Sequence, residues 1–480
     1  MRPIIEEINL NRTPFQVYSY LHSMPESAFL DSGMDPGKLG RYSFIGIEPF
    51  MEFTSKSKRV RVNSEGWKKE FYGNPFNVLQ DLLNRHRSDF RTGLFPFWGG
   101  AIGWFSYDLK DFFEDLPDLS KDDIGMPDCE LRFYDVVLAF DNLKNKAYIC
   151  SSGLPEHGKR KSLRARARLD SVKCRLENIL DNDKPLYMAE ESDPLPDDCG
   201  LTSNVSRDDY KKAVLKAKDH IEAGEIYQVN LSRRFSAETG QRPFRIYSAL
   251  RRINPAPFAA YLNYGDIKII SASPERYIRV SGEGIQTRPI KGTRPRGKNK
   301  TEDRKLRENL KNSIKDRAEN LMIVDLERND LGRVCVYGTV RVTEFMICEE
   351  FPTVFHLTST VEGRLRPGID TRAIFKNCFP GGSITGAPKI RSMEIIEELE
   401  PVKRAVYTGA VGYIGFNGDM DTSVVIRTLI HKNKKLYFNV GGGIVYDSVP
   451  EKEYEETIHK ASAMIRVLTD STGVVNGAKK

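Results

Sequence analysis

Cysteine is scarce in this sequence, with seven residues scattered among 480 and no Cys-x-x-Cys pair. A disulfide framework needs an even set of cysteines, and a thiol metal site needs closely spaced pairs. The sequence offers neither arrangement. We therefore expect reduced thiols and a cytoplasmic protein.

Long apolar runs and several familiar motifs are missing too. No stretch approaches the roughly 20 apolar residues of a membrane span, and the first residues lack the apolar core of a signal peptide. No cysteine lies in a Gly-x-Cys-x-Gly elbow, so the chain has no glutaminase nucleophile of that kind. The segment 379–389 nearly matches a P-loop, but Ala387 stands where the motif needs lysine. We expect neither a membrane partner nor nucleotide binding.

The net charge is mildly basic, at +7. This balance suits a small anionic substrate at least as well as nucleic acid, and no strong aromatic–basic motif is present. We therefore expect no nucleic-acid partner. With 40% hydrophobic and 29% charged residues, the composition is that of an ordinary globular protein.

The order of the predicted elements favours an α+β fold. Strand-like runs and helical patterns alternate irregularly, not as βαβ units, which favours antiparallel sheets. A capping box at Ser206 predicts a helix that ends at Gly224. The predicted strand at 226–235 has one polar face, with Gln228 on it, which is either solvated or lines a site.

A polar, acidic and proline-bearing stretch at 181–200 is typical of a linker. It predicts an N-terminal segment over 1–180 and a second domain over 201–468. The last residues, 469–480, are expected to form a flexible tail.

Lys291 is the most informative single residue. It lies in the segment 287–297, where four cationic side chains alternate with prolines and glycines and no acid interrupts them. Proline and glycine specify a defined backbone, so the lysine should point to a fixed place. Neighbouring cations and desolvation would lower the pKa of its amine and make it a nucleophile. The alternative is a basic loop that binds an anion or nothing.

Two predicted helices each carry a pair of acids three residues apart, a spacing that puts both acids on one face. The first carries Asp316 and Glu319, and its buried side is predicted to be marked by Leu306, Leu310, Ile314 and Leu321. The pair is either solvated or part of a site.

The second helix, at about 451–468, carries Glu453 and Glu456, with Lys460 one turn further. Two facing pairs of carboxylates would form an oxygen-rich site for a hard divalent ion, Mg²⁺ with water and a substrate carboxylate. The alternative is again that the acids are solvated.

Further places in the sequence could touch a ligand. The segment 379–389 opens a helix, whose first backbone N–H groups can hold an anion. The glycines at 441–443 allow close approach to the backbone, although a bend in a sheet explains them equally well. Arg427 could bind a carboxylate through two hydrogen bonds or form a structural ion pair. His356 could be an acid–base group or a satisfied core histidine.

Together these segments resemble the chorismate-utilising enzymes. The matching motifs lie at 224–231, 273–276, 325–332 and 421–427. The resemblance is dense over about residues 200–466. It implies a large α+β fold in which antiparallel sheets form a sandwich with helices outside, and it implies that 201–468 is the catalytic domain that binds chorismate.

The resemblance also implies roles for individual residues. Mg²⁺ would be held by Glu319 and Glu456, with Asp316 and Glu453 as outer partners. The residues that would hold the carboxylates of chorismate are Arg427, Tyr407, Gly441, Gly443 and Lys460. Those that would lie beside the ring are Ser383, Glu275 and His356, with Glu275 as the expected proton donor.

Two N-terminal segments resemble the tryptophan-pocket segments of the synthase subunits in this family. They contain Ser32, Arg41, Tyr42 and Ser43. The sequence leaves open whether they bind tryptophan, regulate activity or are only structural.

Within the family, Gln228 stands where the isochorismate and salicylate synthases carry a water-activating lysine. Because glutamine is no base at neutral pH, ammonia is the expected nucleophile, delivered by a separate glutaminase subunit. Lys291 and the segment 380–386 resemble the aminodeoxychorismate synthase component I branch, which supplies p-aminobenzoate and folate synthesis. The nearest alternative is anthranilate synthase component I. A remote one is a non-catalytic protein that binds anions or nucleic acid through its basic segment.

Overall fold

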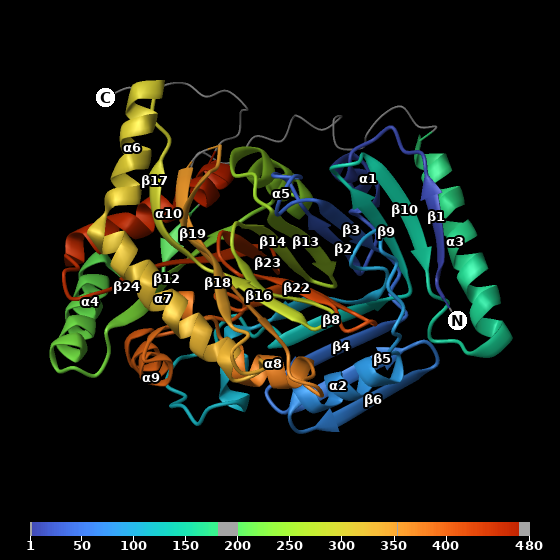
Figure 1. Cartoon of the computed structure of the whole chain (residues 1–480), viewed down its shortest axis with the longest axis horizontal. Coiled ribbons are helices and arrows are strands. Elements are labelled where there is room, and N and C mark those ends of the chain that lie inside the picture. Colours follow the sequence, from blue (N-terminus) through green and yellow to red (C-terminus); the bar gives the residue numbers. More distant parts are fainter. Residues whose placement is uncertain (1, 181–199, 353, 470–480) are drawn as a thin grey trace.

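The chain folds around two large antiparallel β-sheets that pack face to face, with helices on the outside (Figure 1). The computed structural model describes residues 2–180, 200–352 and 354–469. None of the helices in these ranges is long and apolar enough to cross a membrane.

The first sheet crosses the whole molecule. Its strands run in the order β1 (Ile4–Ile8), β10 (Lys146–Ser151), β9 (Val136–Asp141), β3 (Tyr42–Gly46), β2 (Ser27–Asp31), β13 (Phe258–Tyr264), β14 (Ile267–Ser273), β23 (Thr428–Lys432), β24 (Lys435–Ile444), β12 (Gln228–Glu238) and β11 (Thr202–Ser203), with β20 (Gly386–Ala387) paired to β12.

The second sheet is of similar size. Its order is β17 (Ile290–Pro295), β19 (Val354–Arg364), β16 (Gly284–Arg288), β15 (Arg276–Ser281), β22 (Met420–Val424), β21 (Ala410–Gly415), β7 (Gly100–Phe105), β8 (Cys129–Tyr134), β4 (Met51–Lys56), β5 (Arg59–Ser64) and β6 (Trp67–Tyr72), with β18 (Arg341–Glu350) paired to β19.

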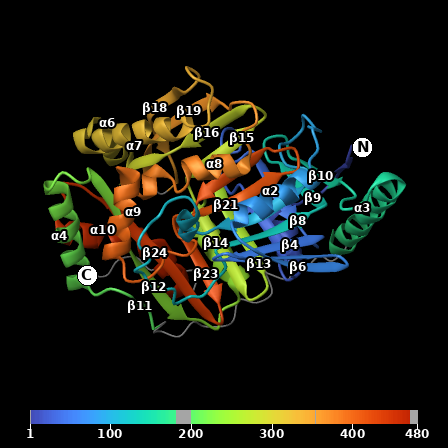
Figure 2. The ribbon, with the colours of Figure 1, turned by 90° about the horizontal axis from the view of Figure 1, so that it is seen from below.

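The helices cover the outer faces and ends of these sheets, with α3 and α4 at opposite ends of the molecule in both views (Figures 1 and 2). They are α1 (Pro14–Leu21), α2 (Pro75–Arg85), α3 (Gly158–Leu180), α4 (Arg207–Glu222), α5 (Pro243–Ile253), α6 (Lys300–Asn312), α7 (Ile314–Gly332), α8 (Thr371–Cys378), α9 (Lys389–Leu399) and α10 (Pro450–Thr469), with the short 3₁₀ turns η1 (Tyr107–Phe112) and η2 (Gly382–Ile384).

Apolar side chains from both sheets form the main core between them, with Phe44 from the first sheet and Phe53 and Trp104 from the second. A second core lies where α1, α3, α5 and α10 cover the first sheet. Burial of the first layer is the main force that holds the two sheets together, and burial of the second holds the helices on the first sheet. The predicted α+β sandwich with outer helices is confirmed.

Both sheets run from the N-terminal segment into the later part of the chain. β2 pairs with β13 in the first sheet, and β7 pairs with β21 in the second. The predicted linker at 181–200 lies outside the described residues except for Gly200, and the predicted tail lies outside them from residue 470. The proposed domain boundaries stay predictions.

The helix predicted after Ser206 is confirmed, because the Ser206 side chain accepts a hydrogen bond from the Asp209 amide at its start. The prediction for the first acid-bearing helix is wrong in part. Ser313 ends α6 and begins α7, so the apolar stripe changes phase there. Leu306 and Leu310 on α6 pack in a small apolar cluster as predicted, whereas Ile314 and Leu321 on α7 are 86% and 54% exposed, so the predicted buried side ends at Ser313.

Candidate active site

Lys291 lies on β17, at an irregularity in its pairing with β19 between Ile290 and Thr293. Gly292 follows it with φ +88°, and a Cβ there would lie 3.0 Å from both Leu310 Cδ1 and Asp316 Cβ. Only glycine suits this backbone and this close packing. The bulge therefore turns the Lys291 side chain out of the regular ladder.

The half-buried Lys291 amine makes no hydrogen bond or ion pair with any residue in the described ranges. Burial lowers its pKa, and the charge of Lys460 adds to this effect. The carboxylates of Glu319, Glu275 and Glu456 act in the opposite direction. The amine thus lies among groups from α7, α10 and the turn between β14 and β15, and its uncharged form is favoured relative to a free lysine.

The other cations of the segment 287–297 are all paired. Arg288 binds Glu344 and Glu349 on β18, and the remaining two pairs are Arg294 with Asp316 and Arg296 with Asp303. Acids from elsewhere in the chain thus neutralise the basic segment that lacks acids of its own. Lys291 differs from its neighbours because its amine forms no ion pair with an acid in the described ranges.

Glu275 is the buried acid of the site, with 4% of its surface exposed. Ser383 Oγ donates a hydrogen bond to Glu275 Oε1 at 2.7 Å, and the Ile290 amide approaches the same oxygen at 3.4 Å. Burial raises the pKa of Glu275 to about 7, although the Ser383 hydrogen bond and the charges of Lys291 and Lys460 oppose it. A carboxyl of this kind can be a proton donor at neutral pH.

Arg427 is a cation without a counter-charge in the described part of the chain. It follows β22 with φ +52°, and its guanidinium makes no hydrogen bond or ion pair within the described part of the chain. Burial lowers its pKa, which the nearby Tyr407 partly opposes. A desolvated guanidinium needs an anion, and its planar donors match a carboxylate. The chemistry of this place therefore suits a carboxylate-bearing ligand.

His356 is buried and neutral. Its Nδ1 lies 2.9 Å from Thr293 Oγ1 on the neighbouring strand. Burial and the charge of Arg427 lower its pKa to about 3. The imidazole is therefore uncharged at neutral pH and acts there as a neutral hydrogen-bonding group.

Glycines on β24 pair with β12, the strand that carries Gln228 and Asn230. Gly443 lies opposite Asn230, and a Cβ at Gly443 would lie 2.8 Å from Gln228 Nε2. Gln228 is fully buried, and neither atom of its amide has a hydrogen-bond partner in the described chain. A buried amide left without partners indicates a place for a ligand or an ordered water molecule. The other glycine, Gly441, accepts a hydrogen bond from Lys460 Nζ at 2.9 Å through its carbonyl oxygen.

The acids of α10 also converge on this glycine run. A Cβ at Gly442 would lie 3.4 Å from Glu453 Oε2 and 3.5 Å from Glu456 Oε1. Glu456 forms an ion pair of 2.7 Å with Lys460, which lowers its pKa although burial acts to raise it. Burial raises the pKa of Glu453, whose other oxygen accepts from Ser448 at 2.7 Å.

Two acids of α7, Glu319 and Asp316, have different surroundings. Burial raises the pKa of Glu319, and Lys291, Asp316 and Glu456 are all close enough to influence it. Asp316 is held by Arg294 at 2.7 Å. Within the described ranges, no three His, Cys, Asp or Glu side chains are grouped closely enough to form a complete metal site. Glu319 and Glu456 approach each other from two helices, and their hard oxygen donors fit Mg²⁺ if a ligand carboxylate completes the set.

The N-terminal residues predicted as a tryptophan pocket do lie together. Ser32 Oγ donates to the Tyr42 carbonyl at 2.5 Å, and the Ser32 amide donates to Ser43 Oγ at 3.1 Å. Arg41 binds Asp141 at 2.8 Å. The Ser32 and Ser43 hydroxyls and the Arg41 guanidinium thus have partners within the protein, and whether tryptophan binds stays a prediction.

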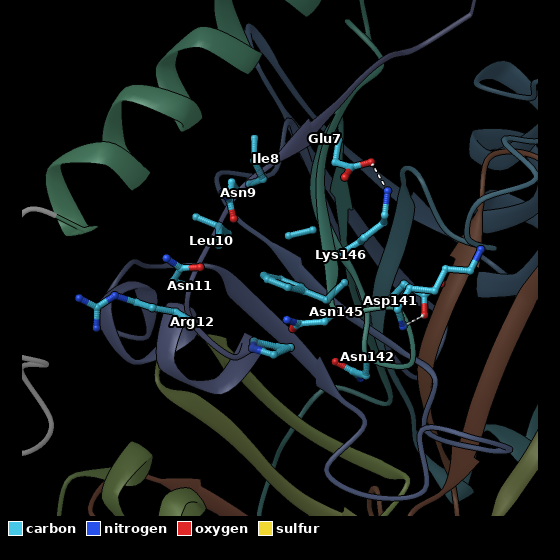
Figure 3. Close-up of a pocket in the computed structure, with 14 residues that line it drawn as sticks. Glu7, Ile8, Asn9, Leu10, Asn11, Arg12, Asp141, Asn142, Asn145 and Lys146 are labelled. Carbon is cyan, nitrogen blue, oxygen red and sulfur yellow. Dashed lines mark hydrogen bonds and ion pairs between the residues drawn. The ribbon is translucent and has the colours of Figure 1, made fainter.

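Asp141 also lines a cleft of about 550 Å³ at the end of the first sheet (Figure 3). The Glu7–Lys146 ion pair, 2.9 Å long, lies in its wall. None of the residues that line this cleft belongs to the group around Lys291. We place the candidate active site at Lys291, because the unpaired cations, the orphaned amide and the perturbed carboxyls are gathered there.

Sequence reasoning missed one buried acid next to the site. Glu327 on α7 is 4% exposed, and its Oε1 accepts a hydrogen bond of 3.0 Å from the Gly382 amide. With Asp330 it forms a third pair of acids at three-residue spacing. The same spacing that singled out the other pairs could have found this one.

The family model described as chorismate binding enzyme matches residues 26–466. Anthranilate synthase component 1 of Acetivibrio thermocellus is 39% identical over 477 residues, which cover 98% of this chain and 95% of that protein. Aminodeoxychorismate synthase component 1 of Escherichia coli is 38% identical over 458 residues, covering 94% and 95%. The solved structure of anthranilate synthase component I from Streptococcus pneumoniae superposes with a TM-score of 0.78 at 34% identity, covering 89% and 92%.

Proposed function

The chain belongs to the chorismate binding enzyme family, and we propose that within it the chain converts chorismate and ammonia to 4-amino-4-deoxychorismate and water. The observation that carries this proposal is Lys291, a half-buried amine without a partner among the described residues, whose pKa is lowered and which lies near a protonatable acid. Relatives of nearly equal identity are named for either of two products. The choice between them rests on the chemistry of this amine.

In the proposed first step, the free amine of Lys291 adds to C2 of the chorismate ring. Both conjugated double bonds of the ring shift, and the bond between C4 and its hydroxyl oxygen breaks. Glu275 gives its proton to the departing oxygen, which leaves as water, and the Glu275 carboxylate then takes the proton that the new ammonium at Nζ loses. The buried Glu275 suits this role because its pKa of about 7 keeps much of it protonated at neutral pH.

In the second step, ammonia attacks C4 and both double bonds shift back. The bond between C2 and Nζ breaks. Glu275 gives its proton to the leaving Nζ and takes one from the new ammonium at C4, so Lys291 returns as an amine and the enolpyruvyl ether remains on the product. The covalent intermediate divides one difficult displacement into two easier ones. If ammonia attacked C2 directly, pyruvate would be lost and anthranilate would form. A lysine on C2 blocks that path.

Cationic and backbone groups around Lys291 would hold the substrate. Arg427 and Tyr407 would bind one carboxylate of chorismate, and Lys460 with the backbone of Gly441 and Gly443 would bind near the other. These assignments follow from the uncompensated guanidinium and from the open backbone of the glycine run. Ser383 and His356 would contact the ring as neutral hydrogen-bonding groups.

Mg²⁺ would be held by Glu319 and Glu456, with Glu453 and Asp316 outside them. When bound, the ion supplies positive charge that neutralises a ring carboxylate and draws electron density from the ring. The residues themselves hold like charges near each other, and Lys460 and Lys315 compensate part of that charge. Ammonia would come from a separate glutaminase subunit.

Product identification tests the proposal. Purified protein is mixed with chorismate, Mg²⁺ and an ammonium salt, and products are separated by chromatography while pyruvate release is followed. We expect 4-amino-4-deoxychorismate without stoichiometric pyruvate. For Lys291→Ala we expect loss of this product, whereas Lys298→Ala, at an exposed lysine directly after the segment, is the matched control. Unchanged product formation by Lys291→Ala would exclude the covalent role, and anthranilate with pyruvate from the unmodified protein would assign the other product.

A further inference from the structure

Glu327 connects helix α7 to the turn that carries Ser383. Its Oε1 accepts the Gly382 amide hydrogen at 3.0 Å, and the side chain is almost fully buried. A Cβ at Gly382 would lie 2.5 Å from Leu326 Cδ2, so the turn η2 rests directly on α7. A buried carboxyl at such a contact replaces the hydration that the Gly382 amide loses on folding.

The next residue in the turn reaches the proposed proton donor. Ser383 Oγ donates to Glu275 Oε1 at 2.7 Å. Two adjacent residues of η2 are thus held from opposite sides, Gly382 through its backbone by Glu327 and Ser383 through its side chain by Glu275. The position of the Ser383 hydroxyl depends on how the backbone before it is fixed.

We propose that Glu327 is a positioning residue, which fixes the turn at Gly382 and thereby aims the Ser383 hydroxyl at Glu275. The proposal rests on the proposed function, because it needs Glu275 to be the proton donor. Glu327 is not among the residues that we assign to the substrate or to the reacting atoms. It lies on the same helix as Glu319, so one element fixes both an ion-binding acid and the hydrogen bond of the proton donor.

Several charged groups face these two acids. Asp330 on α7, Lys389 on α9 and Glu275 influence Glu327, and Lys389 is paired with Asp330. Burial and the charge of Asp330 raise the pKa of Glu327 to about 7. Glu275 is influenced by Lys291 and Lys460. A carboxyl oxygen accepts the Gly382 hydrogen bond in either protonation state, and so does the amide oxygen of glutamine.

A double-mutant cycle tests the proposal through kcat. In Glu327→Ala the Gly382 amide loses its partner, and we expect kcat to fall about tenfold to a hundredfold, as a displacement near 1 Å can cause. Glu327→Gln keeps the acceptor and should stay within about twofold of the unmodified enzyme. In a Ser383→Ala background, Glu327→Ala should lower kcat no further, because both changes remove the same contact. Independent, multiplicative losses would overturn the proposal, and so would a Glu327→Gln variant as slow as Glu327→Ala.

The pH profile gives a second readout that a merely structural role would not move. The Ser383 hydrogen bond lowers the pKa of Glu275, so its loss should shift the alkaline limb of kcat to higher pH in Ser383→Ala and in Glu327→Ala alike. If Ser383→Ala leaves this limb in place, the assignment of Glu275 as proton donor fails, whereas the cycle in kcat still decides the role of Glu327. If Glu327→Ala does not fold, Glu327→Asp, which withdraws the acceptor by one methylene, replaces it in the cycle with the same expected loss.

Discussion

Replacing Glu275 by glutamine should stabilise the protein at alkaline pH while it removes the proposed proton donor. Burial raises the pKa of this carboxyl from its ordinary value of 4.5 to about 7 in the folded chain. Between these two values the folded state binds the proton and the unfolded state does not. The Glu275 contribution to stability is therefore fully present below pH 4.5 and is lost as the pH rises through 7.

The magnitude follows from the two pKa values. Proton linkage between pH 5 and pH 8.5 gives a loss of about 2.5 kcal/mol from this single group. Glutamine has the same shape and keeps an oxygen for the Ser383 hydroxyl, but it does not titrate. The stability difference between Glu275→Gln and the unmodified protein should therefore increase, in favour of the variant, by about 2.5 kcal/mol over this range.

Equilibrium urea unfolding at both pH values measures this difference. Trp98 and Trp104 are 2% and 0% exposed, so their fluorescence reports loss of the core between the sheets. Other titrating groups change the free energy of unfolding of both proteins equally, so their contributions cancel in the difference between the two proteins. Glu222→Gln on the exposed surface of α4 is the matched control and should show no such trend. A flat difference for Glu275→Gln, within about 0.5 kcal/mol, would refute the view that burial keeps this carboxyl protonated.

Three further changes test other parts of the site. Glu456→Gln should abolish product formation at every Mg²⁺ concentration, measured as initial rate against Mg²⁺, whereas exposed Glu455→Gln should retain activity. Gly443→Ala would place a Cβ 2.8 Å from Gln228 Nε2, so we expect a loss of about 1–3 kcal/mol in urea unfolding from overpacking. Arg427→Lys keeps the charge but loses the planar pair of donors, and kcat/KM for chorismate should fall about tenfold to a hundredfold.

Each of these expectations has a contrary outcome. Normal rates for Glu456→Gln in the presence of a chelator would exclude its part in an ion site. Gly240→Ala, where nothing lies within 4 Å of the added Cβ, should be nearly neutral, and an equal loss at Gly443 and Gly240 would exclude the packing argument. Unchanged kcat/KM in Arg427→Lys would mean that this guanidinium does not bind the substrate.

Local sequence was sufficient for the elements whose signals are local. The cap at Ser206 and the helix after it were predictable, because a capping hydrogen bond joins residues three apart. The irregular order of strands and helices predicted an antiparallel α+β sandwich correctly. The same reasoning failed at Ser313, because a single residue there interrupts the helix and changes the phase of every apolar residue after it.

The sequence by itself determined which side chains are available: a lysine in a rigid segment, pairs of acids three residues apart, and a glycine run. Only the tertiary structure decided their chemistry. The pKa of Glu275 is raised because strands distant in sequence bury it, and Lys291 differs from the arginines beside it because acids from other elements pair with them and not with it. Desolvation and Coulomb forces act through space, so their effect on a residue depends on which segments the fold brings near it.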